Sequence, residues 1–162
     1  MEDELFLCEV DPDYLKFLHK LDFRVSVKYN NRPFVGVITM INGIYYLLPL
    51  TSQTTKEREK TGKKKRAAKI TTFIRGEHNE EIANILHNNM IPVMEELFKH
   101  IEISSEDTYE ANEIRFIRKN KEKIINKAKK VHEERLTNND WFLNKTCCDF
   151  NKLEQHFREY KK

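Results

Sequence analysis

The stretch that decides the fold reads FVGVITMI from Phe34 to Ile41, then NG at Asn42-Gly43, then IYYLLPL from Ile44 to Leu50. Two apolar runs separated by an Asn-Gly pair are typical of a β-hairpin, because the favoured two-residue turn needs φ > 0 at both central positions. The sequence therefore predicts two strands joined at this pair.

The second strand leads into two hydroxyl residues, Thr51 and Ser52, and then into a basic loop. Between positions 56 and 69 the chain carries eight basic and two acidic side chains. Hydroxyls at a strand end beside dense positive charge suit a phosphate group. The basic residues of the loop are Lys56, Arg58, Lys60, Lys63, Lys64, Lys65, Arg66 and Lys69.

Further strands are predicted on both sides of the hairpin, at Leu5–Val10 before it and at Ala67–Ile74 after it. A helix is expected to begin at Asp11-Pro12-Asp13, because Asp caps free amides and Pro fits the first helical position. Residues 80 to 91 fit either a helix or a strand. We expect a strand from about Ile82, because Pro92 prevents a helix from continuing. Residues 97 to 103 are expected to be extended.

Helical patterns dominate the last third of the chain. Helices are predicted at Glu106–Lys119 and Lys121–Leu136, with Asn120 as the break between them. The apolar segment Trp141–Cys148 is expected to be a last strand, followed by a helix capped by Asp149. Strands first and helices later predict a compact α+β domain with a twisted antiparallel sheet. A chain of 162 residues is long enough for one such domain, spanning 1–162.

Composition excludes several classes of protein. No window approaches the roughly 18 consecutive apolar residues of a membrane span. The acidic start Met-Glu-Asp-Glu is unlike a basic signal peptide, so a cytoplasmic location is expected. Cys8 stands alone and Cys147-Cys148 are adjacent, which suits neither a disulfide framework nor a zinc site.

Positive charge is concentrated in two segments. Residues 56 to 69 and residues 115 to 135 each carry +6, whereas the rest of the chain sums to −9. One basic run is usually only a solvated surface, but two such runs on an otherwise acidic chain favour a polyanionic partner. The sequence therefore predicts nucleic-acid binding.

The residue types near the hairpin suit metal-independent cleavage of RNA, in which the 2′-hydroxyl attacks the adjacent phosphate. No closely spaced carboxylates or paired histidines indicate a metal site. Lys56 and Arg32 can stabilise charge, and Thr51 and Ser52 can orient the phosphate. Tyr29 can stack on a base or donate a hydrogen bond. The same residues also fit a simple turn and ordinary packing, so both interpretations stay open at this point.

In these segments the chain resembles the ToxN/AbiQ family of endoribonuclease toxins from type III toxin–antitoxin systems, and in particular its CptN-type members. The matching pieces occur in family order along nearly the whole chain. They are YNNRPFVGV at 29–37, YLLPLTS at 46–52, NNMIPV at 88–93, FIRKN at 116–120 and CCDF at 147–150.

The resemblance implies a fold similar to the Kid/MazF toxins and an RNase that needs no cofactor or metal and leaves 2′,3′-cyclic phosphate and 5′-hydroxyl ends. It also implies a repeat RNA antitoxin, folded as a pseudoknot, that the toxin processes and that inhibits it in a closed RNA–protein assembly. Growth arrest and abortion of phage infection would follow.

Carried over by position, the resemblance assigns the family's catalytic groups to Tyr29, Arg32, Thr51 and Ser52. The lysine that family members carry two residues after the serine is absent here, because Gln53 and Thr54 follow Ser52. Lys56 is the favoured replacement and Lys60 the poorer candidate.

Two sets of cations are expected to bind RNA. The first comprises Lys60, Lys63, Lys64, Lys65, Arg66 and Lys69, and the second, which we expect to hold the antitoxin, comprises Arg115, Arg118, Lys119 and Lys123. Two alternatives remain, a non-catalytic RNA-binding regulator and a protein-binding or structural module.

Overall fold

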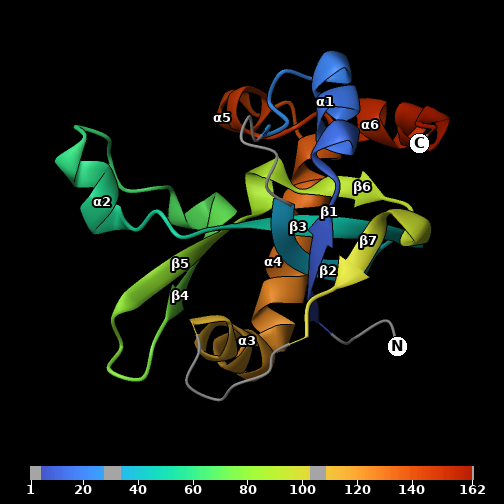
Figure 1. Cartoon of the computed structure of the whole chain (residues 1–162). Helices are drawn as coiled ribbons and strands as arrows, with labels where there is room; N and C mark the ends of the chain where they lie inside the picture. The colour runs from blue at the N-terminus through green and yellow to red at the C-terminus, as the bar shows by residue number, and fades with distance from the viewer. Residues whose placement is uncertain (1–4, 28–33, 103–108, 162) are drawn as a thin grey trace.

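The central hairpin of the computed structural model, which describes residues 5–27, 34–102 and 109–161, has the predicted geometry (Figure 1). Strand β2 (Phe34–Ile41) pairs antiparallel with β3 (Ile44–Thr51), in a register that runs from Gly36 opposite Pro49 to Ile41 opposite Ile44. Asn42 and Gly43 have φ of 50° and 81°. Both turn residues therefore adopt the left-handed conformation that the Asn-Gly pair predicts.

The strands form one seven-stranded sheet in the order β4-β5-β3-β2-β1-β7, with β6 also paired to β3. Every pairing is antiparallel. The α+β prediction is therefore confirmed. The remaining strands are β1 (Phe6–Val10), β4 (Thr71–Arg75), β5 (Glu81–Leu86), β6 (Ile91–Val93) and β7 (Phe98–His100).

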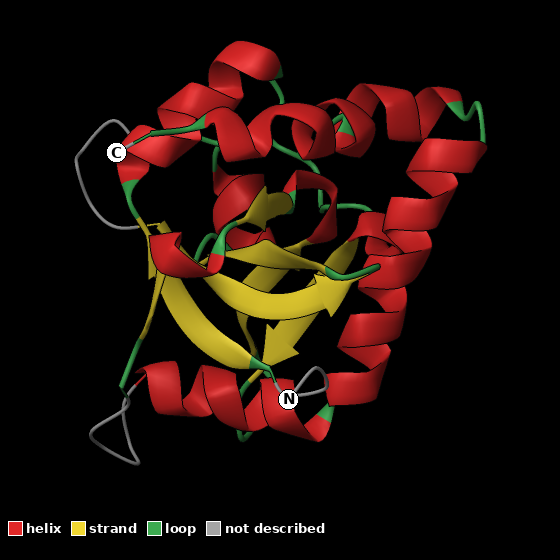
Figure 2. Cartoon of the chain, turned by 90° about the vertical axis from the view of Figure 1, so that its right-hand side faces the viewer, coloured by secondary structure: helices red, strands yellow, loops and turns green. Residues whose placement is uncertain are grey.

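Helices surround the sheet on several sides (Figure 2). Helices α1, α5 and α6 gather at one end of the molecule, α3 lies at the other, and the long α4 runs behind the sheet between them (Figure 1). No helix among the described ranges is long and apolar enough to cross a membrane. The bounds are α1 (Pro12–Leu21), α2 (Thr55–Lys60), α3 (Tyr109–Lys119), α4 (Lys121–Thr137), α5 (Trp141–Thr146) and α6 (Phe150–His156).

Several local predictions are confirmed. Helix α1 begins after Asp11, whose side chain accepts a hydrogen bond from the amide of Asp13. Asn120 separates α3 from α4, and Asp149 caps α6. The ambiguous stretch 80–91 is extended, as β5, and then turns through the 3-10 turn η2 (His87–Asn89) into β6.

Three predictions are wrong or only partly right. Residues 141–146 form helix α5 instead of a last strand, because the Asp140 side chain accepts a hydrogen bond from the amide of Leu143 and starts a helix. The basic loop contains α2, whose first turn Thr54 caps. The strand expected at 67–74 begins only at Thr71, after the 3-10 turn η1 (Ala68–Ile70).

A buried polar contact joins the sheet to the helices behind it. The hydroxyl of Tyr46 on β3 donates to the carboxylate of Glu154 on α6, and Nε2 of His132 on α4 lies 2.7 Å from the same carboxylate oxygen. Tyr46 is fully buried and His132 is 2% exposed. Because an unpaired polar group costs free energy in such surroundings, the three side chains fix α4 and α6 against β3.

This contact predicts a difference between two neighbouring tyrosines. Tyr46→Phe should lower the free energy of unfolding by about 1–3 kcal/mol, because Glu154 loses a donor in a buried site. Tyr45→Phe should change it by less than about 0.5 kcal/mol, because the Tyr45 hydroxyl bonds to no described residue. Urea denaturation of both variants measures the difference, and equal losses would contradict this role of the Tyr46 hydroxyl.

Candidate functional site

The hydroxyls of Thr51 and Ser52 lie at the C-terminal end of β3, where the strand leaves one partner for another. Gly36 of β2 pairs with Pro49, and two residues later Thr51 pairs instead with Asn84 of β5. The register brings the beginning of β2 to the same end of the sheet. Tyr29 and Arg32, the two other residues expected here, precede β2 in the chain and lie outside the described residues.

The hydroxyls of Thr51 and Ser52 differ in their hydrogen bonding within the turn at residues 51–53. Oγ1 of Thr51 accepts a hydrogen bond of 3.2 Å from the amide of Gln53. Ser52 is exposed, and its hydroxyl bonds to no other described residue. Thr51 therefore shapes the turn, whereas Ser52 presents a hydroxyl that a ligand can reach.

Arg66 anchors this turn from the far end of the basic loop. Its Nη1 donates to the carbonyl oxygen of Gln53 at 2.8 Å and to Oδ1 of Asn84 at 3.0 Å, and its Nη2 donates to Oε1 of Gln53 at 2.9 Å. Burial lowers the pKa of Arg66, and the neighbouring Arg58 lowers it further. The guanidinium therefore ties residue 53 to β5 directly after the two hydroxyls.

Glu81 holds the beginning of α2 on the other side of the same network. Its Oε2 accepts hydrogen bonds of 2.8 Å from the amide of Thr55 and from Nδ2 of Asn84. Burial alone would raise the pKa of Glu81, but these hydrogen bonds outweigh burial and lower it. A carboxylate that stays ionised thus fixes the backbone immediately before Lys56.

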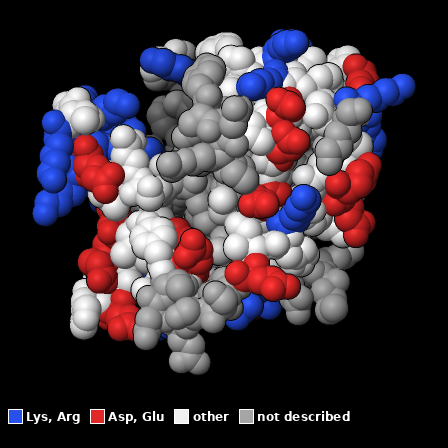
Figure 3. Space-filling model, viewed as in Figure 1, with Lys and Arg blue, Asp and Glu red and all other residues white. Residues whose placement is uncertain are grey.

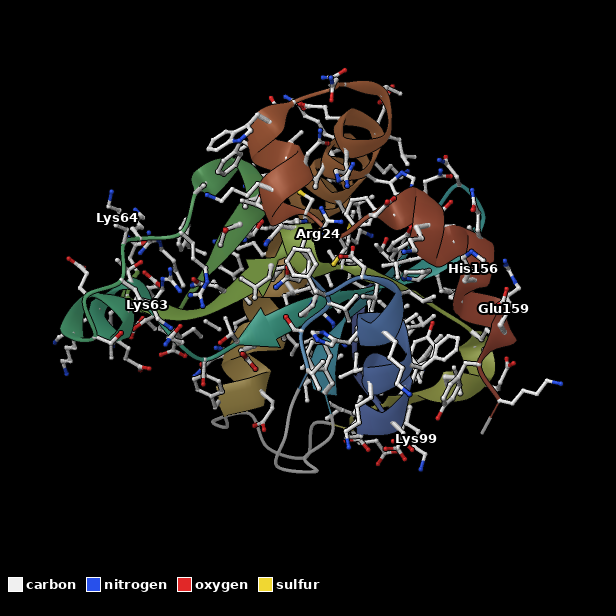
Figure 4. The ribbon with its side chains drawn as sticks, turned by 90° about the horizontal axis from the view of Figure 1, so that it is seen from above. Arg24, Lys63, Lys64, Lys99, His156 and Glu159 are labelled. Atoms are coloured by element: carbon white, nitrogen blue, oxygen red, sulfur yellow. The ribbon has the colours of Figure 1, made fainter. Side chains whose placement is uncertain are left out.

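Most other cations of the loop extend into solvent, whereas Arg58 is half-buried and donates from Nε to the carbonyl oxygen of Lys64 at 2.8 Å. Lys56 and Lys60 are exposed on α2, and Lys63 and Lys64 lie at the outer end of the loop (Figure 4). Nζ of Lys65 lies 4.9 Å from the ring centroid of Phe73 on β4. Basic side chains cover this projecting part of the surface, at the left of Figure 3. They make a positive edge next to the hydroxyls.

Lys69 has a different environment from the rest of the run. Its Nζ lies 3.8 Å from Glu134 on α4 and 3.9 Å from Asp140 at the start of α5. These contacts join the end of the basic loop to the C-terminal helices. The pairing partly cancels the charge that the sequence assigned to RNA binding.

The second set of cations lies on α3 and α4, away from β3. Arg115 forms an ion pair with Glu77 at 3.2 Å and donates to Asn112 at 2.8 Å. A cavity of about 420 Å³ opens between α3 and the β4–β5 turn, and Lys119 lines it beside Arg75. Arg118 and Lys123 are exposed. These cations form a second basic surface beside the β4–β5 turn, and neither hydroxyl residue lines its cavity.

Among the described residues, histidines and acids form no metal-binding cluster that could act together with the hydroxyls. Within the described ranges, no three His, Cys, Asp or Glu side chains gather as a metal-binding group. His87 is fully buried beside Thr72, and burial lowers its pKa to about 3. The groups that the structure offers at this edge are hydroxyls, amides and cations, together with the Glu81 carboxylate that holds the turn. Such an arrangement can bind a phosphate and stabilise negative charge that develops on its oxygens.

Sequence reasoning missed the residues that position this edge. Gln53 and Asn84 were not singled out, and Glu81 fell in the ambiguous stretch 80–91, just before the predicted strand. The buried amide of Asn84 inside an otherwise apolar strand is the one local signal that could have found it. Its partners, Arg66 and Glu81, are identified only when the loop folds back on β5.

Comparisons with known proteins agree on one family. The family model described as "Toxin ToxN, type III toxin-antitoxin system" matches residues 6–158. Endoribonuclease ToxN of Bacillus thuringiensis subsp. kurstaki is 29% identical over 94% of this chain and 82% of its own length. Endoribonuclease AbiQ of Lactococcus lactis subsp. lactis is 28% identical over 94% of this chain and 87% of its own length.

Solved structures support the same assignment. One solved structure superposes with a TM-score of 0.79 at 28% identity, covering 98% of this chain and 99% of that one. It is described as a study of type III toxin–antitoxin systems and of selective toxin inhibition by a non-coding RNA pseudoknot. The structure of AbiQ superposes with a TM-score of 0.80 at 23% identity, covering 96% and 97%, and shows the shared fold. The chain thus has the sequence pattern, the sheet and the helices of one family, and it belongs to the ToxN toxins of type III toxin–antitoxin systems.

Proposed function

We propose that this chain is an endoribonuclease and acts as the toxin of a type III toxin–antitoxin system in the bacterial cytoplasm. Its relatives ToxN and AbiQ are named endoribonucleases. The observation that carries the proposal is the exposed Ser52 hydroxyl on a turn that Arg66 holds in place, beside a positive edge. This arrangement suits the binding of one RNA phosphate.

The proposed reaction needs no metal, because RNA carries its own nucleophile. The 2′-oxygen attacks the adjacent phosphorus, its proton is lost, and the bond from phosphorus to the 5′-oxygen breaks as that oxygen gains a proton. The products are a 2′,3′-cyclic phosphate and a 5′-hydroxyl. Ser52 and Thr51 would orient the phosphate, Lys56 and Arg32 would stabilise charge on its oxygens, and Tyr29 would stack on a base.

The proposed inhibitor is a repeat RNA that the toxin cuts from its own precursor. One structure with a TM-score of 0.79 is described with inhibition by an RNA pseudoknot. We extend this partner to the present chain, in a closed assembly with several toxin copies. The cations of α3 and α4 would hold the antitoxin outside the hydroxyl edge, because they lie on a separate surface.

The first test is cleavage of an adenine-rich RNA in the presence of a chelator. The wild-type protein should cut it, and Ser52→Ala or Lys56→Ala should slow cleavage about 100-fold or more, because each removes a group from the phosphate. Lys60→Ala should retain most activity. The new 5′ ends should accept phosphate from a kinase without prior dephosphorylation.

Binding without cleavage by the wild-type protein would instead support a non-catalytic RNA-binding regulator. Full activity in both Ser52→Ala and Lys56→Ala would contradict the proposed site.

Arg66 provides a second test, because its role is positioning. Arg66→Lys keeps the charge but cannot make the forked contacts to Gln53 and Asn84, so cleavage should fall about 10- to 100-fold. The salt dependence of RNA binding should stay the same. Lys64→Ala should instead retain cleavage and change binding: the slope of log RNA affinity against log salt concentration, which we call the salt slope, should fall by about one. An Arg66→Lys variant with full activity would show that only the charge of Arg66 matters.

The α3–α4 surface gives a third test. The double variant Arg118→Glu/Lys119→Glu should bind the repeat RNA at least about 10-fold more weakly, with a salt slope lower by about two. Lys20→Glu/Lys152→Glu, on helices at the other end of the molecule, is the matched control (Figure 1). Antitoxin affinity measured by filter binding should distinguish them, and equal affinity of the two double variants would contradict this antitoxin site.

A further inference from the structure

Two aromatic side chains are mostly exposed to solvent, and the positively charged group of a neighbouring residue lies over each ring. Phe23 is 77% exposed and Trp141 is 73% exposed, whereas most large apolar side chains of the described residues are buried or half-buried. The Arg24 guanidinium carbon lies 5.3 Å from the Phe23 ring centroid, and Nζ of Lys145 lies 5.2 Å from that of Trp141. We call these four residues the aromatic platform.

The platform is built on elements that are fixed to one another. Arg24 donates from Nε to Asp22 at 2.8 Å and from Nη1 to the carbonyl of Asn144 on α5. The side-chain oxygen of Asn144 in turn accepts from Arg135 at 3.1 Å. The turn that carries Phe23 is therefore bonded directly to the helix that carries Trp141. Arg24 occupies a central position beside α5 in the view from above (Figure 4).

Two routes of hydrogen bonds and ion pairs connect the elements of the platform to those of the hydroxyl edge. Along the first, Asn89 of η2 donates to Oγ of Ser26 at 2.9 Å, and η2 directly follows β5, whose Asn84 pairs with Thr51. Along the second, Lys69 joins the end of the basic loop to Asp140, the residue before Trp141. The platform and the hydroxyl edge are therefore carried by one connected set of elements.

The charges of the platform favour a polyanion. The nearby carboxylates Asp22 and Asp140 already contact Arg24 and Lys69. Lys145 has no carboxylate within ion-pair distance in the part of the chain that the structure describes. An apolar protein surface would have to bury the Lys145 amine without a partner, whereas single-stranded RNA offers bases for the rings and a phosphate for this cation.

We propose that Phe23 and Trp141, with Arg24 and Lys145, stack unpaired bases of the RNA substrate. This proposal rests on the proposed function, because it assigns a substrate-binding surface to the same site. Stacking is tolerant of sequence, so the platform supplies affinity and extends the bound strand. It does not touch the reacting atoms.

Trp141 is the only tryptophan of the chain, so its fluorescence reports on the platform directly. A single-stranded adenine-rich oligoribonucleotide added to the Ser52→Ala protein should quench this emission saturably. The RNA concentration that gives half-maximal quenching should match the Kd measured by fluorescence anisotropy of a labelled RNA. The same RNA annealed to its complement should quench much less, because its bases are already stacked. RNA binding without quenching would overturn the proposal.

Variants separate the platform from the catalytic groups. Trp141→Ala and Phe23→Ala should each raise KM for a single-stranded RNA about 5- to 100-fold, with a smaller fall in kcat. Trp141→Phe should recover part of the loss, because a ring remains. Leu136→Ala, which removes another exposed apolar side chain from α4, is the matched control. An unchanged KM in both alanine variants of an active enzyme would overturn the platform and leave the endoribonuclease proposal intact.

Two further outcomes keep the proposals distinguishable. If the wild-type protein cuts no RNA, the proposed function fails, and quenching by single-stranded RNA still decides whether the platform stacks bases. If the Trp141 emission shifts with protein concentration in the absence of RNA, the platform is an interface between copies of this chain, and the stacking proposal is overturned.

Discussion

Strand β3 hydrogen-bonds to three other strands, and the position of the candidate site depends on this shared pairing. Its first residues pair with β2 and β6, and its last two, Leu50 and Thr51, pair with β5. The close approach of β2 is possible because residue 36 is glycine, whose Cβ equivalent would lie 2.5 Å from the carbonyl oxygen of Leu48. The change of partner takes place at the end of the strand, directly before Ser52. The hydroxyls of Thr51 and Ser52 leave the sheet at that point, on a rigid support.

Cations of one short run have different roles because their surroundings differ. Arg66 is bonded to acceptors from the turn and from β5, and it shapes the site. Lys69 pairs with acids on two helices, whereas Lys63 and Lys64 extend into solvent. A phosphate can recruit a solvated cation readily, but it can recruit the hydrogen-bonded Arg66 only by breaking the bonds that hold the turn. Counting charge along the sequence could not make this distinction.

The misassigned segment 141–148 shows how a local rule outweighs composition. Its aromatic and cysteine residues favour a strand, and the prediction followed them. The capping contact from Asp140 and the helical contact between Trp141 and Lys145 make it a helix instead. Helical spacing places the lysine amine over the indole ring. The pair of Trp141 and Lys145 in the aromatic platform is therefore a direct consequence of the element that sequence reasoning assigned wrongly.

The sequence alone determined the hairpin at Asn42-Gly43, the α+β order of elements, the caps of α1 and α6, and the hydroxyl pair at a strand end beside positive charge. These signals are local, because turn geometry, capping and side-chain periodicity depend on neighbouring residues. Only the tertiary structure decided that Arg66 anchors the turn and that Arg24, the neighbour of Phe23, bonds to α5. Those contacts join residues far apart in the chain, and the acceptors they use become available only when the sheet and the helices have packed.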